Sequence, residues 1–168
     1  MGATPDMFMD KATGKPMEFW TAVKSGRSTG APAVLKMLHL AWSDHGKLGW
    51  DQGFQNAKNL ATNGYQLTPR TAELLQVLPK MTEPGEGVKK YFYGSDGKPY
   101  AAGTLMKNPA FAKTMDDIAT QGIDVFYKGY IAQDIVKAVQ SKPIPGTLSM
   151  EDMANVRVER KEPLCQTY

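Results

Sequence analysis

The sequence contains one cysteine, two histidines and no long apolar run, and each shortage excludes a class of protein. The single Cys165 cannot form an internal disulfide. No stretch approaches the roughly 18 apolar residues that a bilayer-spanning helix needs. The first ten residues include Pro5 and two aspartates but no apolar core, so they do not resemble a signal peptide. We therefore expect neither a disulfide scaffold nor a membrane span.

Residues that could carry catalysis or hold a metal are also sparse. His39 and His45 are six positions apart, so on one continuous helix they would lie on different faces, and nothing nearby completes a zinc site. Adjacent carboxylates on a helix point apart. We therefore interpret Asp116–Asp117 as solvated helix surface and Glu151–Asp152 as a helix N-terminus. We assign no catalytic, substrate-binding, cofactor-binding or metal-binding residue.

The remaining candidate binding features are weak. The net charge of +3 is spread along the chain without the basic stripe typical of nucleic-acid binders. Ser25–Gly30 is rich in glycine and hydroxyls but lacks the spacing of a phosphate-binding loop, so we interpret it as a connector. We expect Phe19–Trp20 and Tyr91–Tyr93 to pack against the core rather than to bind a ligand.

Helical patterns dominate what is present. Hydrophobic residues make up 42% of the chain and charged residues 22%, which is enough to build a core. Apolar residues recur at helical spacing between proline and glycine signals. We predict helices over about 32–46, 50–64, 68–79, 108–122 and 126–143, and a short one after the capping-box sequence Ser149–Asp152. Pro32 is expected in the first turn of its helix and Pro79 at the end of another.

One hairpin is expected among these helices. Residues 80–88 are predicted to form a loop, Tyr91–Tyr93 have the aromatic bias of a strand, and Asp96–Gly97 can form a tight turn. The predicted fold is mainly α: a multi-helix, orthogonal-bundle-like segment with one short β-hairpin. We predict one helical domain over 1–168, with an irregular lead segment 1–31, a helical body 32–156 and an extended tail 157–168.

Short sequence blocks run in a fixed order along the chain. They are Met7–Asp10 with Gly14–Pro16, His45–Trp50, Ala57–Thr68, Thr104–Ala110, Ile118–Gly129, Ile131–Ile135, Gly146–Ala154, Arg157–Leu164 and Thr167–Tyr168. The sequences Phe-Tyr-Lys-Gly, ending at Gly129, and Glu-Asp-Met-Ala, ending at Ala154, are the most informative. Together the blocks resemble the large subunit of the gamma-glutamyltranspeptidases. The resemblance weakens at Ala33, where the family usually has glycine.

The resemblance implies a parent enzyme with the αββα core of an N-terminal-nucleophile hydrolase, made as a precursor that cleaves itself. A threonine freed by that cut would attack the gamma-glutamyl group of glutathione or a related amide and form an acyl-enzyme. The family's substrate-binding arginine would lie before Met1, and its threonine after Tyr168. Arg27 and Arg70 do not lie in the required motif, so no catalytic residue is transferred to this chain.

The resemblance makes this chain a non-catalytic scaffold of that enzyme. It implies as partners the upstream part of the large subunit, the catalytic small subunit and the parent's glutathione-like substrate; it implies no cofactor. Such enzymes are exported to the periplasm or the cell exterior. Two alternatives remain open: a free-standing helical interaction module, or a relative acting on cephalosporin or polyglutamate substrates. Helices without their packing partners would expose apolar surface, so we also expect self-association.

Overall fold

The structure is a computed structural model that describes residues 4–167, apart from the side chains of Lys80 and Met81, and it is mainly helical. The longer helices are α2 (Val34–His45), α3 (Gln55–Asn63), α4 (Pro69–Met81), α6 (Pro109–Gln121) and α8 (Tyr130–Val139). The shorter ones are α1 (Phe19–Val23), α5 (Glu86–Phe92), α7 (Asp124–Tyr127) and α9 (Met150–Ala154), with 3-10 turns η1 (Gly26–Ser28) and η2 (Trp50–Phe54). The strands β1 (Tyr65–Gln66) and β2 (Leu105–Met106) pair antiparallel.

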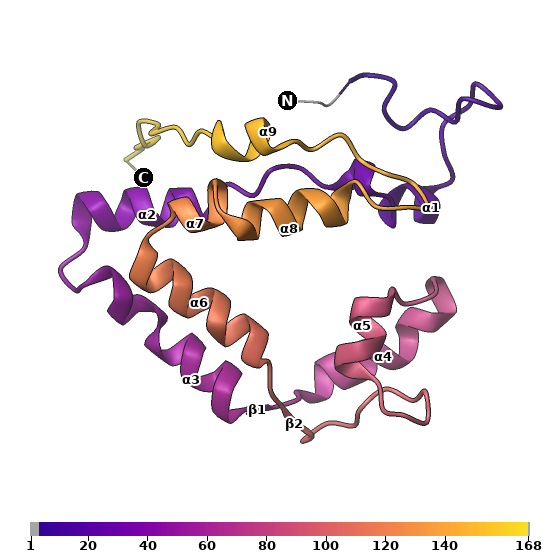
Figure 1. The fold of residues 1–168 in the computed structure, drawn as a ribbon, viewed down its shortest axis with the longest axis horizontal. Coiled ribbons are helices and arrows are strands. Elements are labelled where there is room, and N and C mark those ends of the chain that lie inside the picture. The colour runs from indigo at the N-terminus through magenta and orange to yellow at the C-terminus, as the bar shows by residue number, and fades with distance from the viewer. Residues whose placement is uncertain (1–3, 168) are drawn as a thin grey trace.

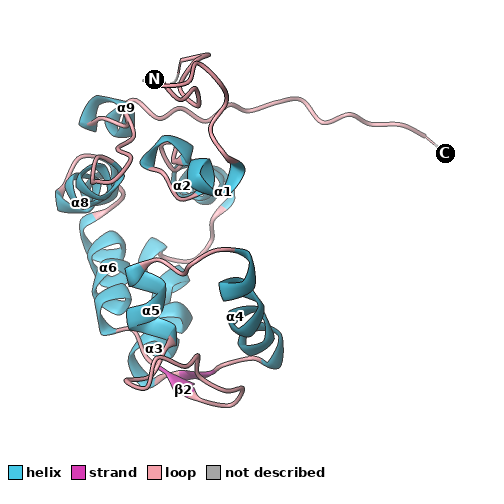
Figure 2. Ribbon diagram, turned by 90° about the vertical axis from the view of Figure 1, so that its right-hand side faces the viewer, coloured by secondary structure: helices cyan, strands magenta, loops and turns pink. Residues whose placement is uncertain are grey.

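The helices form two regions joined by the small sheet (Figure 1). We call α2, η2, α3 and α6–α9 the body. In the body α2, α7, α8 and α9 form one layer, and α3 and α6 run side by side away from it. Residues 65–106, which carry α4 and α5, form the lobe. The tail after α9 is joined to α2 by a bidentate ion pair between Arg160 and Asp44, and its end extends away from both regions (Figure 2).

The body core lies between helices that are distant in sequence. Tyr127 is 1% exposed, and its hydroxyl accepts the backbone N–H of Lys36 at 3.0 Å and donates to the carbonyl of Pro32 at 2.9 Å. Tyr127 therefore joins α7 to the start of α2, because its hydroxyl is both an acceptor and a donor. The buried members of the core are Tyr127, Ala132, Val139, Leu148, Met153 and Val156.

The lobe has a separate core. Its buried residues are Leu67, Ala72, Leu75 and Met106, covered by Tyr65, Val88, Tyr91, Phe92 and Tyr93. The hydroxyl of Tyr93 donates to the carbonyl of Leu75 at 3.1 Å and so joins α5 to α4. Every member of this core lies within residues 65–106, and the core is closed where β1 pairs with β2 at the two ends of the lobe.

Most predicted helix ends are confirmed. Gly46, Gly64 and Gly122 follow the last residues of α2, α3 and α6, and the latter two have φ of 103° and 81°, which glycine adopts without strain. Thr68 and Asn108 cap α4 and α6 with their side-chain oxygens, each followed by proline. The predicted mainly α fold with one short pair of strands is likewise confirmed.

The predicted hairpin is wrong in its first strand. Tyr91 and Phe92 belong to α5, where Val88, Tyr91 and Phe92 share one face and pack on the lobe core. That packing outweighs the strand preference of aromatic residues. The turn at Asp96–Gly97 is confirmed, with Gly97 at φ 74° and Tyr93 bridged to Pro99. The strands lie instead at β1 and β2, which no sequence signal indicated.

Two proline predictions are also wrong. α2 begins at Val34 rather than near Pro32, whose carbonyl is held by Tyr127. α4 continues past Pro79 to Met81, because a proline in a last turn removes only one helical hydrogen bond. The loop predicted at 80–88 is therefore reduced to residues 82–85.

The helix predicted over 126–143 is two helices. It breaks at Gly129, where an added Cβ would lie 2.6 Å from the carbonyl oxygen of Val125. In α8 the buried residues are Ile131, Ala132 and Val139, whereas Ala138 is exposed. Phe111 is also exposed, because it borders a shallow apolar groove beside Leu60 instead of entering the core. Residues 157–167 form an extended arm.

No helix in residues 4–167 is both long enough and apolar enough to cross a bilayer. The longest described helices have 13 residues, short of the roughly 20 that a bilayer core requires.

Candidate functional site

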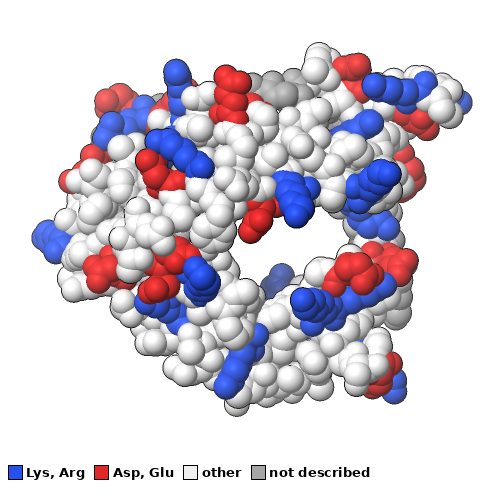
Figure 3. Space-filling model, in the orientation of Figure 1, with Lys and Arg blue, Asp and Glu red and all other residues white. Residues whose placement is uncertain are grey.

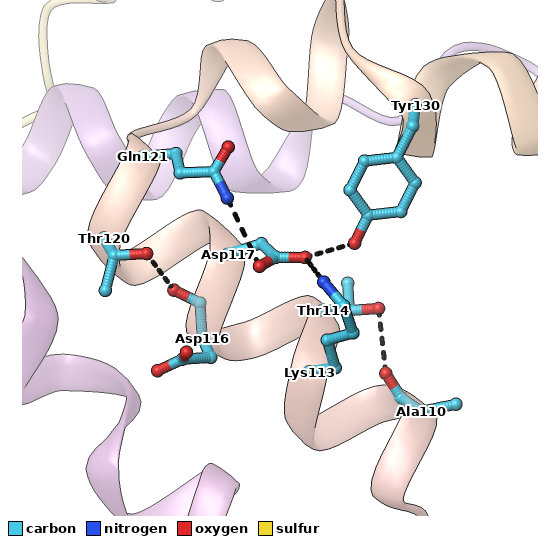
Figure 4. A network of polar contacts seen from close by, with 8 residues as sticks. All are labelled: Ala110, Lys113, Thr114, Asp116, Asp117, Thr120, Gln121 and Tyr130. Atoms are coloured by element: carbon cyan, nitrogen blue, oxygen red, sulfur yellow. Dashed lines mark hydrogen bonds and ion pairs between the residues drawn. The ribbon is translucent and has the colours of Figure 1, made fainter.

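The densest group of polar contacts surrounds Asp117 on α6 (Figure 4). Its side chain accepts hydrogen bonds from Lys113 at 2.6 Å, from Gln121 at 3.3 Å and from the hydroxyl of Tyr130. Lys113 and Gln121 lie one helical turn on either side, whereas Tyr130 opens α8. The network therefore ties α6 to α8.

The network shifts the pKa values of Asp117, Lys113 and Tyr130. The ammonium of Lys113, followed by the hydroxyl of Tyr130, holds the pKa of Asp117 below its ordinary value. The same carboxylate raises the pKa of Lys113, and chiefly through its hydrogen bond it raises the pKa of Tyr130. All three shifts favour an ionised Asp117 beside a protonated Lys113 and a protonated Tyr130.

This arrangement corrects the interpretation of Asp116–Asp117 as solvated surface. Asp117 is only 7% exposed, and the side chains of Lys113, Gln121 and Tyr130 surround its carboxylate. Asp116 instead pairs with Lys58 and so joins α6 to α3. Spacing could have revealed part of the network, since Asp117 lies four residues from both Lys113 and Gln121. Only the packing of α8 brings Tyr130 to it.

His39 belongs to a cluster of rings rather than to a polar site. The ring of His39 lies 5.5 Å from that of Trp42 and 4.9 Å from that of Trp50, and Trp50 contacts Phe54 at 4.9 Å. The indole N–H of Trp50 donates to the carbonyl of Ile118 at 3.1 Å. The cluster thus packs α2 and η2 against α6. His45 lies in the last turn of α2.

The structure also places the other residues that the sequence analysis considered as candidates. Ser25–Gly30 contains the 3-10 turn η1 and leads into no helix before α2. Asp152 completes the capping box of α9, accepting from the N–H and hydroxyl of Ser149. Phe19 is 67% exposed, which contradicts its expected packing, because α1 has only five residues and no buried side chain. Tyr91 packs in the lobe, where burial raises its pKa to about 12. Cys165 is exposed.

The described surface contains grooves but no enclosed chamber with converging chemistry. A groove of about 720 Å3 runs between Ala33 and the segment from Thr147 to Glu159. Clefts of about 230 and 570 Å3 flank Arg27. An opening lies between the lobe and the helix layer of the body, bordered by side chains of both charges (Figure 3). Ser149 and Asp152 line the first groove, where the serine hydroxyl donates to the carboxylate at 3.0 Å, but both side chains are engaged in the capping box of α9.

Metal ligands do not gather either: across residues 4–167 no three His, Cys, Asp or Glu side chains are grouped so that they could hold an ion. The four-residue network at Asp117 pairs one carboxylate with an ammonium, which neutralises it, and with an amide and a phenol, which donate hydrogen bonds to it. Its chemistry is that of a tie between helices.

Comparisons with known proteins match the chain along its full length. The family model described as gamma-glutamyltranspeptidase matches residues 1–168. Glutathione hydrolase 2 of Arabidopsis thaliana is 29% identical over 98% of this chain and 27% of its own length. Glutathione hydrolase proenzyme 2 of Schizosaccharomyces pombe is 32% identical over 84% of this chain and 23% of its own length.

A solved structure shows the same fold. The gamma-glutamyltranspeptidase of Helicobacter pylori superimposes with a TM-score of 0.81 at 28% identity, over 92% of this chain and 43% of that one. The chain spans about a quarter of the length of the two relatives above. The matched region thus includes both the body and the lobe.

Proposed function

Since the chain belongs to the gamma-glutamyltranspeptidase family, we propose that it is the helical part of the large subunit of an enzyme that transfers or hydrolyses gamma-glutamyl groups. In this proposal the segment is a scaffold without catalytic residues. It supports the αββα core of an N-terminal-nucleophile hydrolase and shapes one flank of its active site. The match over all 168 residues and the TM-score of 0.81 support it.

One observation carries the scaffold role: the residues of the most family-like blocks are packing and capping residues. Tyr127, from the Phe-Tyr-Lys-Gly block, is buried and bridges to Pro32 and Lys36. Met153, from the Glu-Asp-Met-Ala block, is 0% exposed. Residues held in this way determine how helices meet, and they cannot reach a substrate.

The other blocks behave in the same way. Asn108 caps α6 with its side chain and Pro109 occupies the first turn. Gly129 permits the close backbone approach between α7 and α8. Ser149 and Asp152 form the reciprocal capping box of α9. These blocks thus contain residues that the fold uses for capping and close packing, which supports a structural contribution to the enzyme.

The chemistry that we propose for the whole enzyme follows the family. A threonine outside this chain attacks the gamma-glutamyl carbonyl of glutathione or a related amide, with its own α-amine as the base. Backbone amides stabilise the oxyanion, and water or an amino acid then takes up the acyl group. An arginine in the part preceding Met1 holds the α-carboxylate of the substrate, for which a planar guanidinium is well suited. No metal or organic cofactor enters this scheme.

The proposed partners are the preceding part of the large subunit and the catalytic small subunit. One face of α2 supports this, because Val34, Met37 and Leu38 share it at helical spacing and are exposed. In isolation such a face would favour self-association. We further propose one helical domain made of a lead segment 1–31, a helical body 32–156 that here includes the lobe, and a tail 157–168. In this proposal the enzyme is exported to the periplasm or the cell exterior.

The test is a gamma-glutamyl anilide release assay on this chain and on the longest natural protein that contains it. We expect release by the longer protein and none by the 168-residue chain, because the nucleophile and the carboxylate-binding arginine lie outside it. Turnover by the chain alone would refute the placement of the nucleophile. Inactivity of both, with the longer protein intact and folded, would favour a free-standing helical module or a different acyl group.

A further inference from the structure

The lead segment meets the body at a crossing of two glycines. The N–H of Gly26 donates to the carbonyl of Ile144 at 2.9 Å, and that of Gly146 donates to the carbonyl of Val139 at 2.8 Å. A Cβ on Gly26 would lie 1.9 Å from the carbonyl oxygen of Val139, and one on Gly146 would lie 2.1 Å from that of Gly26. The two backbones are thus in direct contact, so η1 has a defined position against the segment that joins α8 to α9.

Arg27 follows that crossing and reaches the lead segment. Its Nη1 donates to the carbonyl of Met7 at 2.9 Å and more weakly to that of Met9 at 3.4 Å, and lies 3.6 Å from the sulfur of Met17. These three residues belong to one turn, 7–17, which its own backbone closes through a bridge between Met9 and Pro16. The guanidinium therefore holds both sides of the turn's base.

Arg27 makes the hydrogen bonds that join this turn to the body within residues 4–167. Clefts of about 230 and 570 Å3 lie on its two sides, the first lined by Met7 and the second by Met9 and Met17. Met7, Met9 and Met17 are half-buried and belong to neither core, so the directional contact with Arg27 adds to partial burial in fixing the turn.

We infer that Arg27 is a positioning residue. It ties turn 7–17 to η1, which is itself held in place where Gly26 crosses Gly146, and so sets the direction in which the chain enters the domain. A planar guanidinium can donate to two carbonyls from one side, whereas an ammonium on a flexible stem does so with poorer geometry. For its effect on catalysis the inference rests on the proposed function, in which the part preceding the turn binds the substrate carboxylate.

The experiment follows amide hydrogen exchange in the longest natural protein that contains the chain, as wild type, R27M, R27K and R70M. The amides of Asp10, Gly14 and Met17 report on the turn, because they donate to carbonyls within it. We expect R27M to speed their exchange about tenfold or more without changing that of α6, since a loosened turn opens locally. R27K should retain part of the protection. R70M controls for loss of an exposed arginine.

The same proteins are assayed for gamma-glutamyl anilide release. We expect R27M to raise KM about tenfold while kcat changes less than threefold, because a displaced substrate-binding segment weakens binding without touching the reacting atoms. Unchanged exchange at the turn, or equal acceleration throughout the chain, would overturn the positioning role. Altered exchange with unchanged kinetics in an active protein would overturn its effect on catalysis. An inactive wild type would refute the proposed function, while the exchange result still decides the role of Arg27.

Discussion

The body and the lobe are both helical, but they are held together over very different distances along the chain. In the body, the hydroxyl of Tyr127 bridges to residues 91 and 95 positions away. In the lobe, the hydroxyl of Tyr93 reaches Leu75, 18 positions away. The lobe core is built within residues 65–106, whereas the body core joins α2 to α9 around it. The hydroxyl contact of Tyr93 therefore closes a much shorter loop of chain than those of Tyr127, at a smaller cost in loop-closure entropy.

The glycines of the two regions give the largest predicted contrast. In the body, G26A would place a Cβ against the carbonyl oxygen of Val139 at 1.9 Å, and both partners are backbone. We expect a loss of about 3 kcal/mol in the free energy of unfolding. In the lobe, Gly87 lies within α5 with no atom near its added Cβ, so G87A should stabilise by about 0.5–1 kcal/mol. Urea unfolding measures both.

The opposite signs of these two changes make the test sharp. A loss in G26A below about 0.5 kcal/mol would mean that η1 can move away from the segment joining α8 to α9, and the glycine crossing would then not be rigid. The variant G85A controls for adding a methyl group where nothing is in its way, because Gly85 precedes α5 and has open space around its added Cβ.

Removal of one hydroxyl in each region tests the range of the contacts. Y127F deletes a buried group that serves two backbone partners, so we expect a loss of about 2 kcal/mol. Y93F deletes one bond of a half-buried residue and should cost about 1 kcal/mol. The near-ultraviolet circular dichroism of the folded variants checks that packing is retained. Equal costs would contradict the greater dependence of the body on distant contacts.

The smallest predicted effect is a pH dependence carried by Asp117. Its pKa is lowered chiefly by Lys113, so its contribution to stability is fully present above its ordinary pKa of 3.8 and is lost as pH falls through the lowered value. D117N removes this contribution. Wild-type unfolding free energy, measured by urea between about pH 2 and pH 5, should therefore fall more steeply with acidity than that of D117N.

At alkaline pH, stability is expected to fall as pH rises rather than as it falls, and this change supplies the control. The pKa of Tyr130 is raised, so its contribution is present below its ordinary value of 10.0 and is lost as pH rises through the raised value. Y130F should flatten that alkaline decline and leave the Lys113–Asp117 pair in place. Identical acid profiles for wild type and D117N would show that the tie between α6 and α8 does not depend on the charge of Asp117.

The accuracy of the sequence predictions differed with the range of the interactions. Helix ends were predicted well at Thr68, Asn108 and Ser149, because a cap is formed by atoms within three residues of the capping side chain. Tyr91–Tyr93 was misassigned because the deciding contacts come from α4, which packs beneath those rings. No pattern in the sequence indicated the two clefts beside Arg27. The network at Asp117 was indicated only by the i, i+4 spacing of its helical members.

The sequence by itself determined most helix ends and the family. Glycines at positive φ, proline after a capping residue and the Ser149–Asp152 box act within one turn, so their outcome is legible without a fold. Only the tertiary structure decided that Asp117 is buried, that Gly26 crosses Gly146 and that Arg27 holds a turn up to 20 residues away. Each of these depends on which surfaces meet, and that choice is made by the free energy of the whole packed chain rather than by local preference.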